Sequence, residues 1–186
     1  MLGDSLSAWV VQGCCAQHTT SGTWPQLLAA RDPSLILGFN AAVPGNTTAQ
    51  MLARMERDVF AYGPDVLFIM GGTNDLAYDV PDSTIVDNIR LMLEAAKARG
   101  IAVVLLTDPP NNAGSSSLLY HYLIMRDALR GLAARESVAL VDVYAALATP
   151  AGGLNKQYAA PDRLHLNAAG QQAISDAAYA ALNPAG

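Results

Sequence analysis

Short apolar runs alternate along the chain with longer stretches in which apolar residues recur at helical spacing. The runs at residues 34–39, 65–70, 101–106 and 138–143 have the length and composition of buried strands. Residues 65–70 follow Gly63-Pro64, and residues 101–106 end shortly before Pro109-Pro110, so turn residues bound both runs. These four runs are the strands that the pattern predicts.

The stretches between the runs predict amphipathic helices at residues 46–62, 83–99 and 118–135. The second of these carries a continuous apolar face made of Ile85, Ile89, Met92, Leu93 and Ala96. Gly100 follows it as a candidate C-cap, and Asn167 is placed to cap a last helix that runs to about Leu182. Strands separated by such helices predict parallel βαβ units with helices on both faces of one sheet.

Residues 1–186 contain no internal repeat and no linker, so we expect a single domain. In an open parallel sheet, ligands bind beyond the carboxyl ends of the strands. The segments that follow the apolar runs are therefore the candidate site, and they are rich in glycine and polar residues. They comprise residues 3–6, 40–46, 71–75 and 107–108.

Composition narrows the class of protein further. Hydrophobic residues make up 52% of the chain and charged residues 15%, which is typical of a folded globular protein. The net charge is −5 and no cluster of Lys and Arg is present, which argues against a nucleic-acid partner. No apolar run is long enough to span a bilayer, so we expect no integral membrane segment.

Neither a disulfide framework nor a metal site is predicted. The two cysteines, Cys14 and Cys15, are adjacent, and the three histidines are scattered, so we expect no metal and no cofactor. The first residues lack the basic and apolar regions of a signal peptide. A cytoplasmic protein and a secreted protein with its leader removed both stay open, as does the oligomeric state.

Four short motifs carry candidate chemistry, although each has a simpler interpretation when taken alone. Gly3-Asp4-Ser5-Leu6 is typical of a turn, and Pro44-Gly45-Asn46 of a loop with a helix cap. Gly71-Gly72-Thr73-Asn74-Asp75 could place an amide donor after a buried strand, or form an Asx turn. In Asp162-Arg163-Leu164-His165 the carboxylate can reach the histidine Nδ1, as in a catalytic pair or a surface ion pair.

Together the four motifs resemble, in order and spacing, those of the SGNH hydrolases, also called GDSL esterases. The resemblance extends over almost the full chain, and the four residues that give the family its name are here Ser5, Gly45, Asn74 and His165. It implies a three-layer α/β/α, flavodoxin-like fold with a mainly parallel five-stranded sheet in the order 2-1-3-4-5. The Gly-x-Ser-x-Gly elbow of the α/β-hydrolases is absent.

By this resemblance, Ser5 is the nucleophile, His165 is its base, and Asp162 orients His165. The oxyanion hole consists of the backbone N–H groups of Ser5 and Gly45 and the side-chain amide of Asn74. This agrees with the chemistry, because a serine hydroxyl needs a positioned base and the oxyanion needs aimed donors.

For the remaining candidates, purely structural roles are at least as plausible as catalytic or binding roles. Asp4 is expected to brace the nucleophile turn, and Asp75 and Asp108 to shape the floor of the site. Trp9, Tyr78 and Tyr158 are candidates for lining a substrate pocket, although core packing is as plausible for each. His18 and His121 fall outside the motifs and are expected at the surface or in packing.

One feature departs from the family pattern. An apolar first strand normally runs into the Gly-Asp-Ser-Leu turn, whereas only Met1 and Leu2 precede the turn here. We therefore expect either a truncated first strand or further residues upstream of Met1.

The sequence favours a serine esterase that acts on small-molecule esters of short acyl chains, with acetylated carbohydrates among the candidate substrates. The short polar connections at residues 111–117 and 152–161 favour an open cleft over a deep acyl tunnel. A thioesterase or lysophospholipase that uses the same site is one alternative. A catalytically silent binding domain on this fold is the other.

Overall fold

The computed structural model describes residues 1–8, 22–112 and 116–184, which form an α/β fold around one parallel sheet. The sheet order is β2-β1-β3-β4-β5, which confirms the flavodoxin-like order expected from the family resemblance. Its strands are β1 (Leu2–Gly3), β2 (Ala41–Ala42), β3 (Val66–Met70), β4 (Ala102–Leu106) and β5 (Ala139–Val141).

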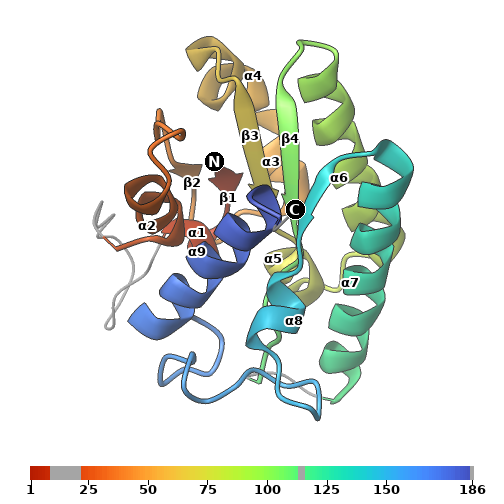
Figure 1. Cartoon of the computed structure of the whole chain (residues 1–186). Helices are drawn as coiled ribbons and strands as arrows, with labels where there is room; N and C mark the ends of the chain where they lie inside the picture. Colours follow the sequence, from red (N-terminus) through yellow and green to blue (C-terminus); the bar gives the residue numbers. More distant parts are fainter. Residues whose placement is uncertain (9–21, 113–115, 185–186) are drawn as a thin grey trace.

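Helices cover both faces of this sheet, and the three layers are visible in Figure 1. The helices are α1 (Ser5–Ala8), α2 (Trp24–Arg31), α3 (Thr48–Ala53), α4 (Met55–Asp58), α5 (Thr73–Ala77), α6 (Asp82–Lys97), α7 (Ser116–Glu136), α8 (Val143–Leu147) and α9 (Ala168–Leu182), with a 3₁₀ turn η1 (Phe60–Tyr62). None of the described helices is long and apolar enough to cross a bilayer.

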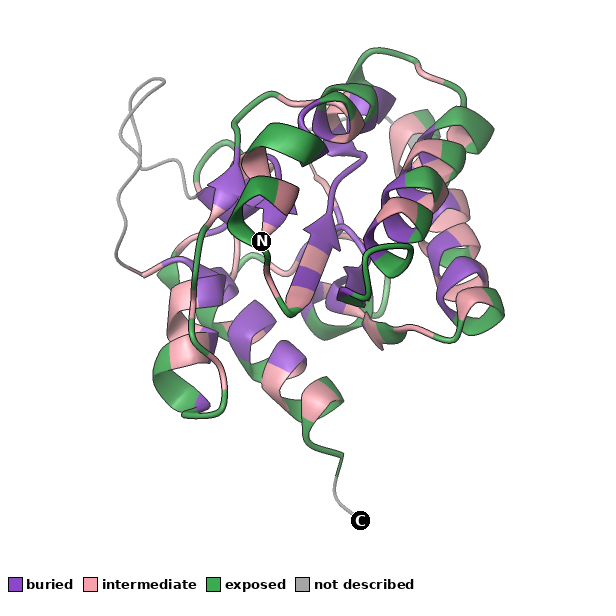
Figure 2. Ribbon diagram, turned by 90° about the horizontal axis from the view of Figure 1, so that it is seen from above, coloured by how far each residue is buried: buried purple, intermediate pink, exposed green. Residues whose placement is uncertain are grey.

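Alternating side chains on the strands divide the core in two. Leu67 and Ile69 of β3 pack with the helices α3, α6 and α7, whereas Met70 packs with α2 and α9 on the other face. The predicted apolar face of α6 is fully buried in the first of these clusters. Figure 2 shows the same division from above, with buried strands between helices that are buried on their inner sides and exposed on their outer sides.

The prediction of a strand at residues 34–39 is wrong. The paired segment is β2, at Ala41–Ala42, where Ala41 N donates to Met1 O (2.8 Å) and the Met1 amino group donates to Phe39 O (3.0 Å). β1 contributes Leu2 and Gly3 to this ladder, paired with Ala41 and Ala42. Residues 34–39 instead border a cavity of about 520 Å³ at the amino ends of the strands, on the edge opposite to Ser5.

Two other boundaries differ from the prediction. The single helix expected at residues 46–62 is divided into α3, α4 and η1, with a break at Arg54 (φ −106°, ψ 5°). The strand expected at residues 138–143 ends at Val141, because Asp142 caps α8 by accepting from Ala145 N (3.0 Å). The last helix matches the prediction, and Asn167 caps it by accepting from Gly170 N (3.0 Å).

Candidate active site

The candidate site lies at the carboxyl ends of the strands. Asp4 directly follows β1, and Gly71 directly follows β3. Asp4 fixes the turn that presents Ser5, because its Oδ1 accepts from Leu6 N (2.9 Å) and its carbonyl accepts from Ser7 N (3.2 Å). Asp4 is fully buried, whereas Ser5 is partly exposed at the start of α1. The hydrogen-bonded turn at Asp4 therefore presents Ser5 at the surface while Asp4 itself stays buried.

His165 reaches Ser5 from the far end of the chain. Its Nε2 lies 3.0 Å from Ser5 Oγ, and its Nδ1 lies 2.7 Å from Asp162 Oδ2. The other oxygen of Asp162 accepts from the backbone N–H groups of Leu164 (3.0 Å) and His165 (2.9 Å). The structure thus brings together the three residues that the sequence singled out as nucleophile, base and orienting carboxylate.

The proton arrangement follows from the state of Asp162. Partial burial raises the pKa of Asp162, but the hydrogen bonds from His165 and Leu164 lower it more, so this pKa lies below its ordinary value. An ionised carboxylate only accepts, so Nδ1 of His165 carries the hydrogen that faces it. Nε2 of the neutral ring is then free to accept from the Ser5 hydroxyl.

Several backbone hydrogen bonds fix the connection that carries His165. Arg163 N donates to Ala160 O (2.9 Å), and Ala160 N donates to His165 O (2.8 Å). Arg163 itself adopts a left-handed backbone (φ +62°), and its carbonyl accepts from Asn112 N (3.1 Å) just beyond β4. These contacts close the turn that points both Asp162 and His165 toward the sheet edge.

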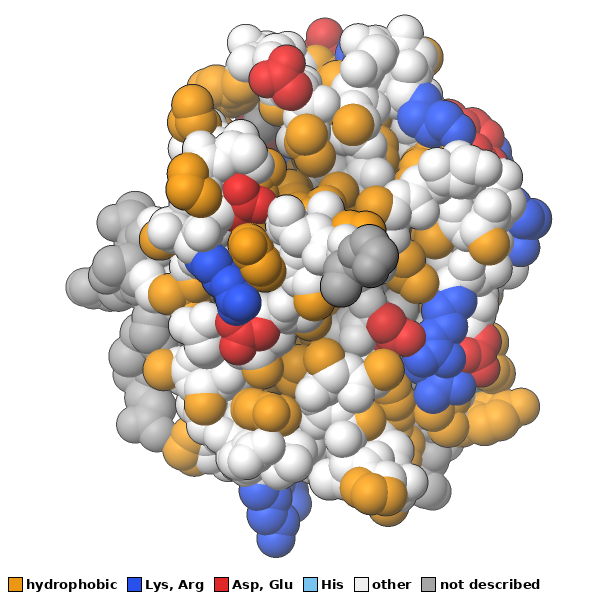
Figure 3. Space-filling model, in the orientation of Figure 1, with side chains coloured by type: hydrophobic (Ala, Val, Ile, Leu, Met, Phe, Trp, Pro, Cys, Tyr) orange, Lys and Arg blue, Asp and Glu red, His pale blue; other side chains and the backbone are white. Residues whose placement is uncertain are grey.

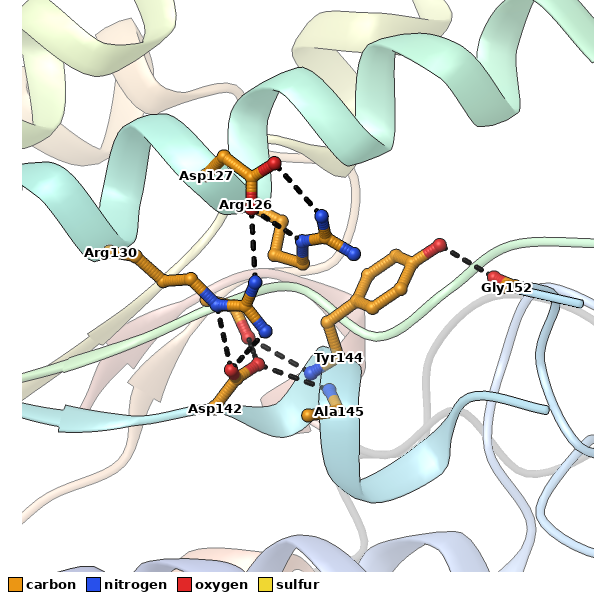
Figure 4. A network of polar contacts seen from close by, with 8 residues as sticks. Arg126, Asp127, Arg130, Asp142, Tyr144, Ala145 and Gly152 are labelled. Atoms are coloured by element: carbon orange, nitrogen blue, oxygen red, sulfur yellow. Dashed lines mark hydrogen bonds and ion pairs between the residues drawn. The ribbon is translucent and has the colours of Figure 1, made fainter. Parts of the chain in front are cut away.

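A polar network on α7, β5 and α8 anchors the start of the same connection (Figure 4). Arg130 donates to Asp142 through Nε (2.8 Å) and Nη2, while Asp142 also caps α8 at Ala145. Tyr144 donates from its hydroxyl to Gly152 O (2.5 Å). The network fixes where the chain leaves α8 on its way to His165, and the sequence pattern gave no sign of it.

The donor predicted at Asn74 lies on α5, directly after the Gly71-Gly72 pair. Asn74 Nδ2 donates to Asp4 Oδ2 (3.2 Å) and to Asn46 O (2.9 Å), so it faces both the nucleophile turn and the Pro44–Asn46 loop. Gly45 in that loop has φ +79°, a conformation that favours glycine, and a Cβ there would meet only open space. Ser5, Gly45 and Asn74 therefore converge on one edge from three different elements.

The glycine pair before Asn74 lets two methionines pack against the backbone. A Cβ on Gly71 would lie 2.6 Å from the Sδ of Met51, and one on Gly72 would lie 2.6 Å from the Sδ of Met125. Gly72 also has φ +134°, which side chains rarely adopt. No residue larger than glycine fits either position without a shift of its neighbour.

Three buried carboxylates, those of Asp4, Asp75 and Asp108, lie beneath the site residues. Asp75 accepts from the N–H (2.8 Å) and hydroxyl (2.6 Å) of Thr48, which joins α5 to the start of α3. Asp108 accepts from the hydroxyl of Thr73 (2.8 Å). Burial raises the pKa of all three carboxyls, that of Asp108 to about 6, and Asp108 raises the pKa of Asp4 further.

The aromatic candidates differ in their exposure to solvent. Tyr78 follows α5 one turn after Asn74 and is 70% exposed, so its ring is accessible to solvent. Tyr158 is partly buried and packs against the core cluster of α9, which favours the packing interpretation. Trp9 and His18 lie outside the described residues, as do Cys14 and Cys15. His121 pairs with Asp82 (2.9 Å) at the surface, which agrees with the surface or packing role expected for it.

Sequence reasoning missed one contributor to the site, Arg54. A charged residue falls on the buried face of the predicted helix, three positions after Met51 and four before Asp58. Such a buried charge with an oppositely charged residue at the i+4 position was the available signal.

A model of the GDSL-like Lipase/Acylhydrolase family matches residues 1–173. The chain belongs to this family. An arylesterase of Vibrio mimicus is 32% identical over 119 residues, which cover 60% of this chain and 55% of that protein. The chain spans about half the length of the curated relatives that it matches.

Solved structures of the GDSL family share this fold. A lipolytic protein of the G-D-S-L family from Desulfitobacterium hafniense DCB-2 matches with a TM-score of 0.83 at 19% identity, over 97% of this chain and 96% of that one. An acetylxylan esterase from Geobacillus stearothermophilus matches with a TM-score of 0.78 at 22% identity, over 97% and 91%. These likenesses confirm the α/β/α architecture that the GDSL motifs implied.

Proposed function

We propose that this GDSL-family chain hydrolyses carboxylic esters of short acyl chains through an acyl-enzyme on Ser5. The observation that carries the proposal is the chain of contacts from Asp162 through His165 to Ser5, at 2.7 Å and 3.0 Å. A hydroxyl that faces a neutral imidazole, itself held by a carboxylate, is the arrangement that activates a serine.

In the first half-reaction, Ser5 Oγ attacks the carbonyl carbon of the ester while its proton passes to His165 Nε2. The oxyanion that forms accepts from Ser5 N, Gly45 N and Asn74 Nδ2. His165 then gives the proton to the leaving alcohol, and the carbon–oxygen bond breaks. Water repeats these steps on the acyl-enzyme and releases the acid with Ser5 restored.

Several features support a short acyl group. Gly45 is exposed with open space where a side chain would start, and Ser5 is partly exposed. An open cleft leaves most of a long chain in water, so each added methylene gains little of the roughly 0.8 kcal/mol that full burial provides. Tyr78 and Trp9 stay the aromatic candidates for contacting the acyl or alcohol group.

The distribution of surface charge argues against a nucleic-acid substrate. On the face shown in Figure 3, Lys and Arg side chains lie in small separate groups, several of them beside Asp or Glu, and form no extended basic patch. Acetylated carbohydrates fit an open, polar cleft, and an acetylxylan esterase is among the proteins that share the fold.

Turnover and labelling of Ser5→Ala test the mechanism, with Ser83→Ala on the exposed start of α6 as the matched control. We expect the wild type and Ser83→Ala to hydrolyse p-nitrophenyl acetate and to react with a fluorophosphonate. Ser5→Ala is expected to do neither beyond residual background. Failure of the fluorophosphonate to label wild-type Ser5 would favour a silent binding domain.

A series of p-nitrophenyl esters tests the acyl preference. We expect kcat/KM to be highest from acetate to butyrate and to fall from about eight carbons onward, because an open cleft cannot enclose the longer chains. A rise that continues through octanoate and decanoate would favour the thioesterase or lysophospholipase alternative.

A further inference from the structure

A buried arginine lies directly behind the candidate site. Arg54 stands at the break between α3 and α4, and its side chain is only 9% exposed. Arg57, three residues later, is 78% exposed, so burial is particular to Arg54. Burial lowers the pKa of Arg54, which reflects the cost of removing a guanidinium from water. Such a cost is tolerated only where the donors find partners.

The guanidinium of Arg54 finds partners on three segments of the site. Nη2 donates to Gly3 O (3.0 Å), Nη1 donates to Ala41 O (2.5 Å), and Nε donates to Asn46 Oδ1 (2.7 Å). Nη1 also pairs with Asp58 (3.2 Å). Because the guanidinium is planar and rigid, these bonds fix the end of β1, the start of β2 and the Pro44–Asn46 loop relative to one another.

Two of these contacts lead to proposed oxyanion donors. Gly3 lies two residues before Ser5, and Asn46 directly follows Gly45. Asn46 also accepts from Asn74 Nδ2 through its carbonyl (2.9 Å) while its side chain accepts from Arg54. One side chain therefore touches the segments that carry two of the donors and reaches the third through Asn46.

We propose that Arg54 is a positioning residue that holds the Ser5, Gly45 and Asn74 donors at the spacing required by the oxyanion. This inference rests on the proposed esterase function. Arg54 does not touch the substrate in this scheme, so its loss affects the transition state and leaves substrate binding nearly unchanged. Shifts of about 1 Å in such donors cost roughly 10²-fold in rate.

The first experiment compares Arg54→Lys with Arg57→Lys. Lysine keeps the charge but lacks the planar fork, so it cannot serve three segments at once. Arg57 pairs with the same Asp58 at the surface, which makes its variant a matched control. We expect Arg54→Lys to lower kcat on p-nitrophenyl acetate by roughly 10- to 100-fold, with KM changed less than about three-fold. Arg57→Lys is expected to match the wild type.

Affinity for an arylboronic acid separates positioning from general stability. The boronate forms a tetrahedral adduct on the serine and uses the oxyanion hole. Its dissociation constant should rise in Arg54→Lys by about the factor lost in kcat, at a temperature where circular dichroism shows the variant folded. A folded Arg54→Lys with unchanged kcat and boronate affinity would overturn the proposal.

Asn46→Ala provides a second route if Arg54→Lys fails to fold. It removes the side-chain acceptor of Arg54 Nε but keeps the carbonyl that binds Asn74. We expect parallel losses in kcat and boronate affinity in Asn46→Ala. Where all variants fold, the double variant should lose little more than Arg54→Lys alone, because Asn46 acts through its contact with Arg54. Independent, multiplicative losses, or none in Asn46→Ala, would contradict the proposal.

Ser5→Ala distinguishes this inference from the proposed function. If the wild type hydrolyses esters and Ser5→Ala does not, unchanged folded Arg54 and Asn46 variants overturn the positioning role alone. If the wild type hydrolyses no ester in the series, the rate of fluorophosphonate labelling at Ser5 replaces kcat as the readout. Slower labelling of Arg54→Lys then supports the positioning role, and equal labelling overturns it.

Discussion

Asn74 and Asp4 are joined by a 3.2 Å hydrogen bond from Nδ2 to Oδ2, and the second hydrogen of the same amide goes to Asn46 O. An oxyanion that accepts from Asn74 must therefore replace one of these two acceptors. The bond to Asp4 is the longer one. Burial and Asp108 also raise the pKa of Asp4, which weakens the preference of that carboxyl for its charged, strongly accepting form.

Asn74→Ala removes this donor while leaving α5 intact. We expect kcat to fall by roughly 10²–10³, the usual cost of one lost oxyanion donor, with little change in KM. Steady-state kinetics on p-nitrophenyl acetate measure both constants. Asn183→Ala, at the exposed end of α9, is the control. A change confined to KM would mean that Asn74 only binds substrate.

Asp162→Asn keeps the shape of the side chain but removes its charge. Its NH₂ group would donate toward Nδ1 of His165 and favour the tautomer that cannot accept from Ser5. We expect kcat to fall by up to about 10⁴-fold, a magnitude known from the same substitution in a serine protease, with labelling of Ser5 slowed in parallel. Near-normal labelling by fluorophosphonate would show that the 2.7 Å contact has no part in activating Ser5.

Arg163 tests the backbone strain in the turn before His165. Its left-handed φ of +62° costs a side chain roughly 1 kcal/mol, and the cost is largest for β-branched residues. We expect Arg163→Gly to keep full activity with a Tm at or near that of the wild type. Arg163→Val should lower the Tm and the activity. Equal thermal denaturation curves for the two variants would argue against strain at this position.

Asp108 makes the stability of the chain depend on pH. Its pKa is raised by burial from 3.8 to about 6, so between about pH 4 and 6 the folded chain keeps a proton that the unfolded chain releases. The free energy of unfolding should therefore decrease as the pH rises through this window, by up to about 3 kcal/mol. Asp108→Asn carries no such proton and should flatten the decrease.

Urea denaturation from pH 4 to 7 measures this difference, with Asp87→Asn on the exposed face of α6 as the control. The control should follow the wild-type curve. Parallel pH curves for the wild type and Asp108→Asn would mean that Asp108 does not hold the proton.

The strongest sequence predictions concern elements whose own pattern determines them. Leu67 and Ile69 alternate with residues that face the other helices, and the apolar face of α6 repeats at helical spacing, so both elements could be recognised without knowing their partners. The site residues were recognised because each lies in a short motif next to such an element. The 3.0 Å contact between Ser5 and His165 also needed the family resemblance, since 160 positions separate them.

Elements that depend on a partner were not predicted correctly. Residues 34–39 form an apolar run like a strand, but a strand also needs a partner, and β1 pairs with Ala41–Ala42 instead. The helix predicted at residues 46–62 breaks at Arg54, whose side chain bonds to carbonyls on β1 and β2. Neither event is encoded in the local hydrophobic pattern, because each depends on a group brought near only by the folded sheet.

The packing of Met51 against Gly71, and of Met125 against Gly72, has a consequence for how this family can change over time. Replacement of Gly71 requires the Met51 side chain to shift or to be shortened, whereas Gly72 also has a positive φ that strains any side chain whatever the space. A Gly71→Ala change alone forces the end of the Met51 side chain to move, so the same change should be tolerated better after Met51→Val. The backbone that leads into α5 and Asn74 therefore changes most readily by paired substitutions at Gly71 and Met51, and relatives with a larger residue at the first position are expected to have a shorter one at the second.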